Sequence, residues 1–177
     1  VRDGAPIEPF LTVLPGEGRI ISANCDATHF VNCSGLVKIE NCRFENMLDD
    51  GANIHGIYTR VEEAGQRLVL KYMHYQQHGA PIYLPGDEVT ITRGGTREIA
   101  EVVRVKSADY ADPTRAVLAL EAPARAAKPG DLAENRGRMP EVIIRNTRVA
   151  NNRPRAFLVT TPRPALIEGC EMSNCYC

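Results

Sequence analysis

One short pattern occurs three times in the chain and constrains its fold more than any other feature. An apolar residue alternates with any residue for four positions, a turn residue follows, and a second alternation ends at Asn. The three copies are GLVKIENCRFEN (35–46), EVIIRNTRVAN (141–151) and ALIEGCEMSN (165–174). Asn and Gly tolerate the left-handed backbone that sharp corners need. Short strands between such corners predict the coils of a parallel β-helix, in which each coil packs on the next.

The three copies align on Ile39, Ile144 and Ile167, which are therefore expected to stack. The last two are 23 residues apart, so we expect coils of 23 residues. The side chains expected to point inward after each turn are Cys42 and Phe44, Thr147 and Val149, and Cys170 and Met172. Small thiols at a repeated inward position favour packing as hydrophobes over disulfide or zinc chemistry.

The first two copies are too far apart for adjacent coils, which predicts an insertion between them. Four segments within residues 57–140 have strand character and are separated by turn-rich sequence: 68–74, 87–93, 98–106 and 116–122. Short strands at this spacing predict a small antiparallel barrel or sandwich. We therefore expect an all-β chain with β-helix coils in 1–56, an inserted antiparallel domain in 57–140, and resumed coils in 141–177.

Charge and hydropathy exclude several classes of function. The formal net charge is −1, with 21 basic and 22 acidic side chains, which argues against nucleic acid as a partner. No stretch approaches the roughly 18 apolar residues of a membrane span. Residues 1–10 lack the pattern of a secretory signal. The chain stops within a repeat, so the last coils are expected to be truncated.

The densest polar cluster is LDDGANIHG (48–56), which suits a turn that leads into a strand. With Ile54 inward, Asn53 and His55 face outward. A 23-residue coil places Val31 beneath Ile54 and Asp26 beneath Asp49, about 4.8 Å away along the axis.

Three carboxylates in this space, Asp26, Asp49 and Asp50, should resist joint ionisation. Glycoside hydrolysis requires two carboxyl groups with different pKa values, one that acts as the acid and one that acts as the base. The same aspartates could instead form a solvated corner or bind calcium, and His55 could be purely structural.

At these residues the chain resembles glycoside hydrolase family 110. The resemblance lies in CDATHFVNCSG (25–35), in NCRFENMLDDGANIHG (41–56) and in the stretch from Pro140 to Gly169. It implies a right-handed parallel β-helix and an inverting exo-α-galactosidase that removes terminal α-1,3-linked galactose without metal or other cofactor. The substrate would be a galactose-terminated oligosaccharide or polysaccharide, and the protein would be bacterial and secreted or periplasmic.

The resemblance places the acid and the base among the three aspartates without saying which is which. Weaker candidates for holding sugar hydroxyls are Asn53, His55, Arg155, Thr160 and Thr161. In the repeat alignment Arg155 corresponds to Asp50, and Thr160 to His55. Two other functions stay open: a non-catalytic glycan-binding or structural fragment, and a calcium-dependent polysaccharide lyase with Arg155 as base. The oligomeric state is not specified by the sequence.

Overall fold

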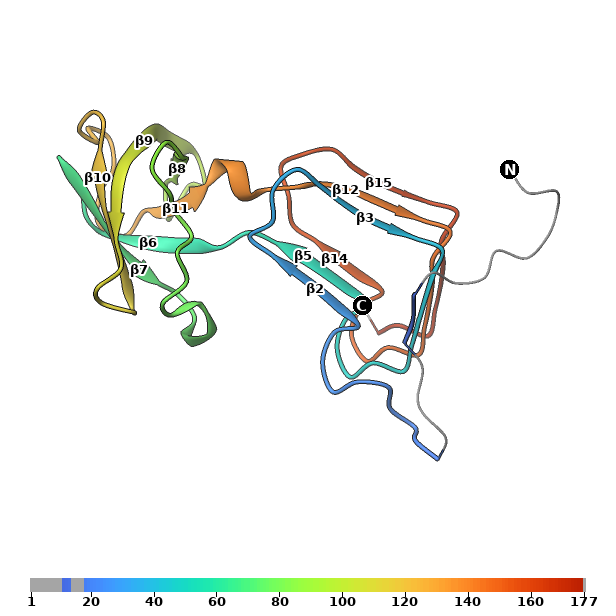
Figure 1. Cartoon of the computed structure of the whole chain (residues 1–177). Coiled ribbons are helices and arrows are strands. Elements are labelled where there is room, and N and C mark those ends of the chain that lie inside the picture. The colour runs from blue at the N-terminus through green and yellow to red at the C-terminus, as the bar shows by residue number, and fades with distance from the viewer. Residues whose placement is uncertain (1–10, 14–17, 177) are drawn as a thin grey trace. The chain divides into compact units, whose positions relative to one another are not determined.

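The computed structural model describes residues 11–13 and 18–176, and it is all-β (Figure 1). It divides into two compact units, one containing residues up to His55 and from Met139 onward, the other Gly56–Arg138. None of the helices in the described part of the chain has the length and apolar character needed to cross a membrane. The expectations drawn from residues 1–10, and any that concern Cys177, lie outside the described residues.

The second unit is a closed antiparallel barrel, which is one of the two architectures predicted for the insertion. Its strands run in the order β10-β7-β6-β11-β8-β9. Their bounds are β6 (Tyr58–Glu63), β7 (Arg67–Tyr72), β8 (Glu88–Thr92), β9 (Ile99–Asp109), β10 (Arg115–Leu120) and β11 (Leu132–Asn135). Two 3-10 helices, Tyr75–Gln77 and Arg136–Arg138, lie in the same unit.

The barrel core comes from strands that alternate buried and more exposed residues. In β10 the alternation buries Ala116, Leu118 and Leu120, which is the pattern expected when one face of a strand lines the interior. The four predicted strands are present. Strands β6 and β11 were not predicted, because each contributes few apolar side chains to the interior: Val61 is the only large aliphatic residue of β6 that is buried.

The first unit consists of parallel sheets made by strands from distant parts of the sequence (Figure 1). Their orders are β1-β4-β13-β16, β15-β12-β3 and β14-β5-β2. The bounds are β1 (Leu11–Val13), β2 (Thr28–Val31), β3 (Leu36–Glu40), β4 (Cys42–Glu45), β5 (Ala52–His55), β12 (Glu141–Arg145), β13 (Arg148–Ala150), β14 (Phe157–Val159), β15 (Ala165–Glu168) and β16 (Glu171–Ser173).

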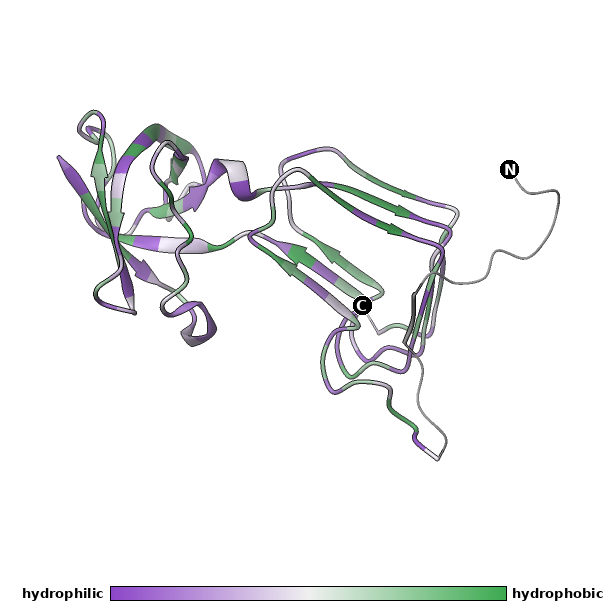
Figure 2. Cartoon of the chain, in the orientation of Figure 1, coloured by the Kyte–Doolittle hydropathy of each residue, from purple (hydrophilic) through white to green (hydrophobic). Residues whose placement is uncertain are grey.

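The predicted stacking of the repeat is confirmed by the strand registers. Ile144 pairs with both Ile39 and Ile167, and Val149 pairs with both Phe44 and Met172. Strands of this unit alternate between apolar and polar residues (Figure 2). The apolar positions of β3, β4, β5, β12 and β13 form one buried cluster. Met172, by contrast, is 53% exposed, because β16 lies at the edge of its sheet among the described strands.

The corners of this unit are built by asparagines in the left-handed conformation, as predicted. Positive φ angles between 48° and 61° occur at Asn32, Asn41, Asn46, Asn146, Asn151 and Asn174. Neighbouring corners are also linked through their amides, since Asn174 Nδ2 donates to Asn151 Oδ1 at 3.0 Å. Gly169 occupies the corner after Asn146, and a Cβ there would lie 2.5 Å from Asn146 Oδ1. The φ of 62° at Gly169 is the same left-handed conformation that the asparagines adopt at the other corners.

Cysteine side chains pack into this unit. The Cys42 side chain is buried in the apolar cluster and its thiol donates to the Glu40 carbonyl at 3.3 Å. Cys33, Cys170 and Cys175 pack against the same cluster. These positions agree with the inward packing expected of Cys42 and Cys170.

The predicted register between β2 and β5 is wrong by one residue. Phe30, not Val31, pairs with Ile54, and Val31 pairs with His55. The reason lies in the corner between β2 and β3, which contains one residue more than the equivalent corner between β14 and β15. Paired residues of β2 and β5 are therefore 24 positions apart rather than 23, and Asp26 falls beside Asp50 rather than Asp49.

The backbone at Gly51 lies close to the neighbouring strands of the first unit. A Cβ at this position would lie 2.6 Å from the Ala156 carbonyl oxygen and 2.8 Å from Val149 Cγ1. We expect Gly51→Ala to lower the free energy of unfolding by about 1–3 kcal/mol, the usual cost of overpacking. Urea unfolding followed by circular dichroism measures this. Gly95→Ala, whose Cβ would meet nothing within 4 Å, is the control, and equal stabilities for the two variants would contradict the prediction.

Candidate active site

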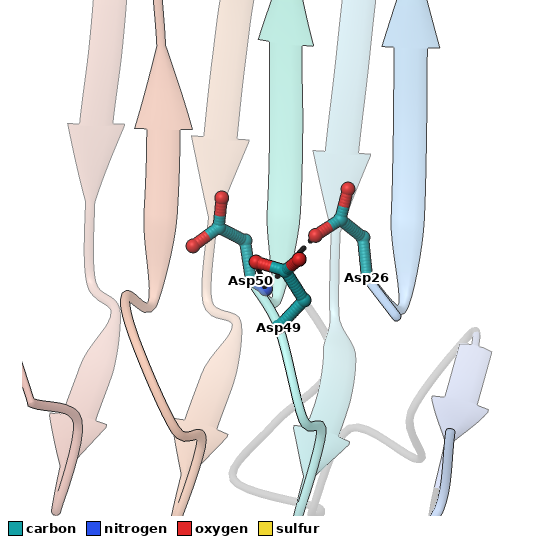
Figure 3. Close-up of side chains that lie close together, drawn as sticks. All are labelled: Asp26, Asp49 and Asp50. Atoms are coloured by element: carbon teal, nitrogen blue, oxygen red, sulfur yellow. Dashed lines mark hydrogen bonds between the residues drawn. The ribbon is translucent and has the colours of Figure 1, made fainter. Parts of the chain in front are cut away.

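Three aspartates gather where β2 and β5 begin (Figure 3). Asp26 lies just before β2, and Asp49 and Asp50 lie just before β5. One carboxylate oxygen of each is within 4.8 Å of the others. The structure thus brings together the three residues predicted from the acidic motif. Their environments differ, however, and this difference determines what each can do.

Asp50 is fully buried and bound to Arg155. Arg155 Nε donates to Asp50 Oδ1 at 2.8 Å, and its NH2 group donates to Oδ2 at 3.1 Å. The backbone N–H of Arg155 also donates to Oδ1, at 3.3 Å. A two-pronged guanidinium contact of this kind fixes both the position and the charge of a carboxylate. Figure 3 shows the Asp50 carboxylate pointing away from Asp26. Asp50 is therefore held for structure more than for proton transfer.

Asp26 and Asp49 share a single donor, the backbone N–H of Asp50. This N–H donates to Asp26 Oδ1 at 2.9 Å and to Asp49 Oδ1 at 3.0 Å. Burial raises the pKa of Asp26, and the nearby charge of Asp49 adds to the rise, while the shared N–H and His29 oppose it. Asp49 is the most exposed of the three. Two close carboxylates therefore differ in their contact with water.

A histidine that the sequence analysis did not single out completes the group. His29 Nδ1 lies 3.1 Å from Asp26 Oδ2, and His29 Nε2 lies 2.8 Å from His55 Nε2. The alternation of THFV places His29 outward, since Phe30 is paired with the buried Ile54. The one-residue register error hid this contact, because it paired Asn32, rather than Val31, with His55.

The outward face of this sheet also contains Asn53. It pairs with His29 on one side and with Leu158 on the other. Its Oδ1 atom is buried and has no hydrogen-bond partner within the described part of the chain. A buried acceptor without a donor is costly. Asn53 is thus suited to accept a hydrogen bond from a ligand hydroxyl.

The two threonines named as candidates behave differently. Thr160 continues β14, and its backbone N–H donates to the Ile54 carbonyl at 2.8 Å, which places it beside His55 as the repeat alignment predicted. Thr161 uses its hydroxyl within the fold, because Oγ1 donates to the Pro140 carbonyl at 2.7 Å. Arg155, expected to hold sugar hydroxyls, instead uses its guanidinium on Asp50.

The aspartates fit a cation less well than their proximity suggests. Calcium takes six to eight oxygen ligands in proteins. Both oxygens of Asp50 are bound to Arg155, which leaves Asp26 and Asp49 as the available carboxylates. Two carboxylates supply only part of the six to eight oxygen ligands that calcium takes, so the donor set favours acid–base chemistry.

Comparison with known proteins gives one family match and a consistent set of relatives. Residues 67–132, within the barrel, match the family model "GLAA-B beta-barrel domain II". The chain is 38% identical over 160 residues to alpha-1,3-galactosidase B of Akkermansia muciniphila, covering 89% of the chain and 20% of the relative. For alpha-1,3-galactosidase A of Bacteroides fragilis the identity is 36% over 163 residues, covering 87% and 26%. For alpha-1,3-galactosidase B of Phocaeicola vulgatus it is 31% over 176 residues, covering 92% and 30%.

These comparisons show that the chain is homologous to proteins named alpha-1,3-galactosidases and that its residues 67–132 match the GLAA-B barrel family. The matches extend over 85–92% of the chain. The chain spans 20–30% of the length of these curated relatives.

The buried ion pair gives a first prediction about the site. Arg155→Met leaves the buried Asp50 carboxylate without its cation, and we expect the free energy of unfolding to fall by about 3 kcal/mol. This is the lower end of the range for breaking a buried pair, because the Arg155 side chain is 39% exposed. Urea unfolding measures the loss. The double variant Asp50→Asn/Arg155→Met should lose less, and a larger loss in the double variant would contradict this account.

The raised pKa of Asp26 gives a second prediction. The folded-state pKa of Asp26 lies above the ordinary value of 3.8. The stability due to protonated Asp26 is therefore fully present below the ordinary, unfolded-state pKa. It is lost as the pH rises through the folded-state pKa. Relative to wild type, Asp26→Asn should therefore gain stability as the pH rises from about 4 to 7. Urea unfolding across this range measures the difference. Asp109→Asn, at the exposed end of β9, is the control, and a pH-independent difference for Asp26→Asn would refute the expectation.

Proposed function

We propose that this chain is part of a glycoside hydrolase of family 110 that removes terminal α-1,3-linked galactose. One observation carries the proposal: Asp26 and Asp49, in the turns before β2 and β5, share the N–H of Asp50, yet differ in burial. The relatives named alpha-1,3-galactosidases support the choice of substrate. A galactose-terminated oligosaccharide or polysaccharide is then the partner.

The environments suggest a division of roles. Asp26, whose pKa is raised by burial, is the proton donor to the glycosidic oxygen. Asp49, the more exposed carboxylate, activates the attacking water. Asp50 and Arg155 hold the turn that supplies the shared N–H, and Asn53 accepts a hydrogen bond from a sugar hydroxyl. Different environments for two carboxylates are the general means of separating acid from base.

The inverting stereochemistry rests on the resemblance alone. Inversion usually requires carboxyl groups about 6.5–9.5 Å apart, and retention about 5–5.5 Å. The nearest oxygens of Asp26 and Asp49 lie within 4.8 Å of each other. Proton NMR of freshly released galactose decides the point, since β-galactose first means inversion and α-galactose first means retention.

The fold, boundaries and location belong to the same proposal. The stacked parallel sheets support a right-handed parallel β-helix, with the barrel as a domain inserted within it near residues 57–140. A metal-independent, secreted or periplasmic bacterial enzyme follows from the resemblance. Neither nucleic acid nor a membrane is proposed as a partner.

The two other functions are less well supported. A polysaccharide lyase would need Arg155 as its base, but this guanidinium is bound to the buried Asp50. A glycan-binding fragment without catalysis remains the second candidate, because the chain spans only 20–30% of its relatives. Sugar binding that survives replacement of both Asp26 and Asp49, without any turnover by wild type, would identify it.

Galactose release tests the proposed activity. The chain is incubated with an α-1,3-linked galactosyl disaccharide, and free galactose is measured. We expect Asp49→Asn to lower kcat about 10²–10⁴-fold, the usual contribution of a general acid or base. Asp109→Asn, which keeps an acceptor for the Ala111 N–H, should retain wild-type activity. Equal activity of Asp49→Asn and wild type, or no release by a folded wild-type chain, would overturn the proposal for this chain.

A further inference from the structure

Asp26, His29 and His55 form a continuous row of hydrogen-bonding atoms. Asp26 Oδ2 lies 3.1 Å from His29 Nδ1, and the Nε2 atoms of His29 and His55 are 2.8 Å apart. The ring centroids of the two histidines are 5.0 Å apart. His29 is thus bonded through both of its ring nitrogens, to a carboxylate on one side and to an imidazole on the other.

The short distance between the two Nε2 atoms permits one hydrogen between them. When one nitrogen carries the hydrogen, the other must accept it through a lone pair. If both histidines were doubly protonated, two N–H groups would face each other at 2.8 Å. The pair therefore accommodates one additional proton and resists a second. With that one proton, His29 donates from Nδ1 to Asp26 and from Nε2 to His55.

We propose that His29 is a positioning residue that orients Asp26 and replenishes the proton that Asp26 delivers, with His55 as the acceptor that stabilises protonated His29. This inference rests on the proposed hydrolase function. His29 acts through Asp26 and is not assigned contact with the sugar.

The proton count balances over one turnover. Asp26 gives its proton to the glycosidic oxygen and becomes a carboxylate. The N–H bond at Nδ1 of protonated His29 then breaks, and an O–H bond forms at Asp26 Oδ2, which leaves His29 neutral. Asp49 accepts one proton from the attacking water and releases it to solvent. Solvent returns one proton to His29, whose side chain is 46% exposed, so Asp49 and the histidine pair both regain their starting states. No oxidant or further reactant is needed.

Charged or titratable groups from several neighbouring elements lie near His29. Charged or titratable groups come from the turn before β2, the turn before β5, β5 itself and the turn before β14. In that order they are Asp26, then Asp49 and Asp50, His55, and Arg155. The positive charge of Arg155 is already matched by Asp50. Asp26 and Asp49 thus remain as the carboxyl groups of this cluster that are not matched by a guanidinium.

Nitrogen NMR of the histidine side chains in the whole chain tests the pairing without any turnover. The chain has four histidines, so His74 and His78, in the barrel unit, serve as internal references. We expect His55→Phe and Asp26→Asn each to change the ring-nitrogen chemical shifts of His29, which report its tautomer and hydrogen bonds, with those of His74 and His78 unchanged. Ring-nitrogen shifts of His29 that are unaltered in both variants would overturn the proposal.

Kinetics test the role in catalysis. His29→Asn keeps an N–H that can donate to Asp26 but cannot take up a proton, so a purely structural role would preserve kcat. We expect kcat to fall about tenfold or more, with KM within about twofold, and the pH dependence of kcat to change. His74→Asn is the control. Wild-type kcat and pH profile in His29→Asn would overturn the replenishing role.

The two levels of proposal fail in different ways. A chain that releases no galactose but has coupled His29 and His55 signals contradicts the hydrolase function and leaves the proton-sharing pair supported. A chain that releases galactose but has independent histidine signals contradicts only the inference about His29.

Discussion

The parallel sheets of the first unit depend on asparagines that hold the left-handed conformation at their corners. An L-residue other than Gly, Asn or Asp is strained in this conformation, so these positions define where each strand ends. The chain turns at the equivalent position of each repeat, so strands that are far apart in sequence pair in register. Ile39, Ile144 and Ile167 are stacked because Asn41, Asn146 and Gly169 turn the chain two residues later. Burial of the apolar positions then stabilises the stack.

The candidate site uses this regularity for a second purpose. Stacked turns bring Asp26, Asp50 and Arg155 together, although Arg155 is 105 residues from Asp50. The guanidinium of Arg155 neutralises the buried carboxylate of Asp50. The backbone N–H of Asp50 is shared by Asp26 and Asp49. A structural ion pair therefore positions the groups proposed to act on substrate. The bond between Asp50 and Arg155 therefore both stabilises the stacked strands and fixes the geometry of the carboxylates.

The sequence predicted the features that depend on local pattern and missed those that depend on the length of a single corner. Alternation and recurrent Asn were sufficient to place Ile39 beside Ile144 and to gather the three aspartates. The additional residue in the corner between β2 and β3 leaves no mark in composition, so Val31 was paired wrongly and His29 was overlooked. Strand β6 was missed because its interior positions include Thr59, whose hydroxyl bonds Tyr83 inside the barrel. The Asp50–Arg155 bond was not predicted, since alignment gives proximity but not partners.

The position of the barrel in the chain has a consequence for the order of folding. Residues 56–138 separate β5 from β12, so contacts such as that of Asp50 with Arg155 close a long loop. Closure of a disordered loop costs more as the loop lengthens, by about 0.6 kcal/mol for each doubling. The first and last barrel strands, β6 and β11, are direct neighbours, with Thr59 paired to Ala133. A barrel that forms first would bring the two ends of the interruption together and turn the long loop into a short one. The inserted unit would then hold its own two ends close together, so that the strands before and after it can pair.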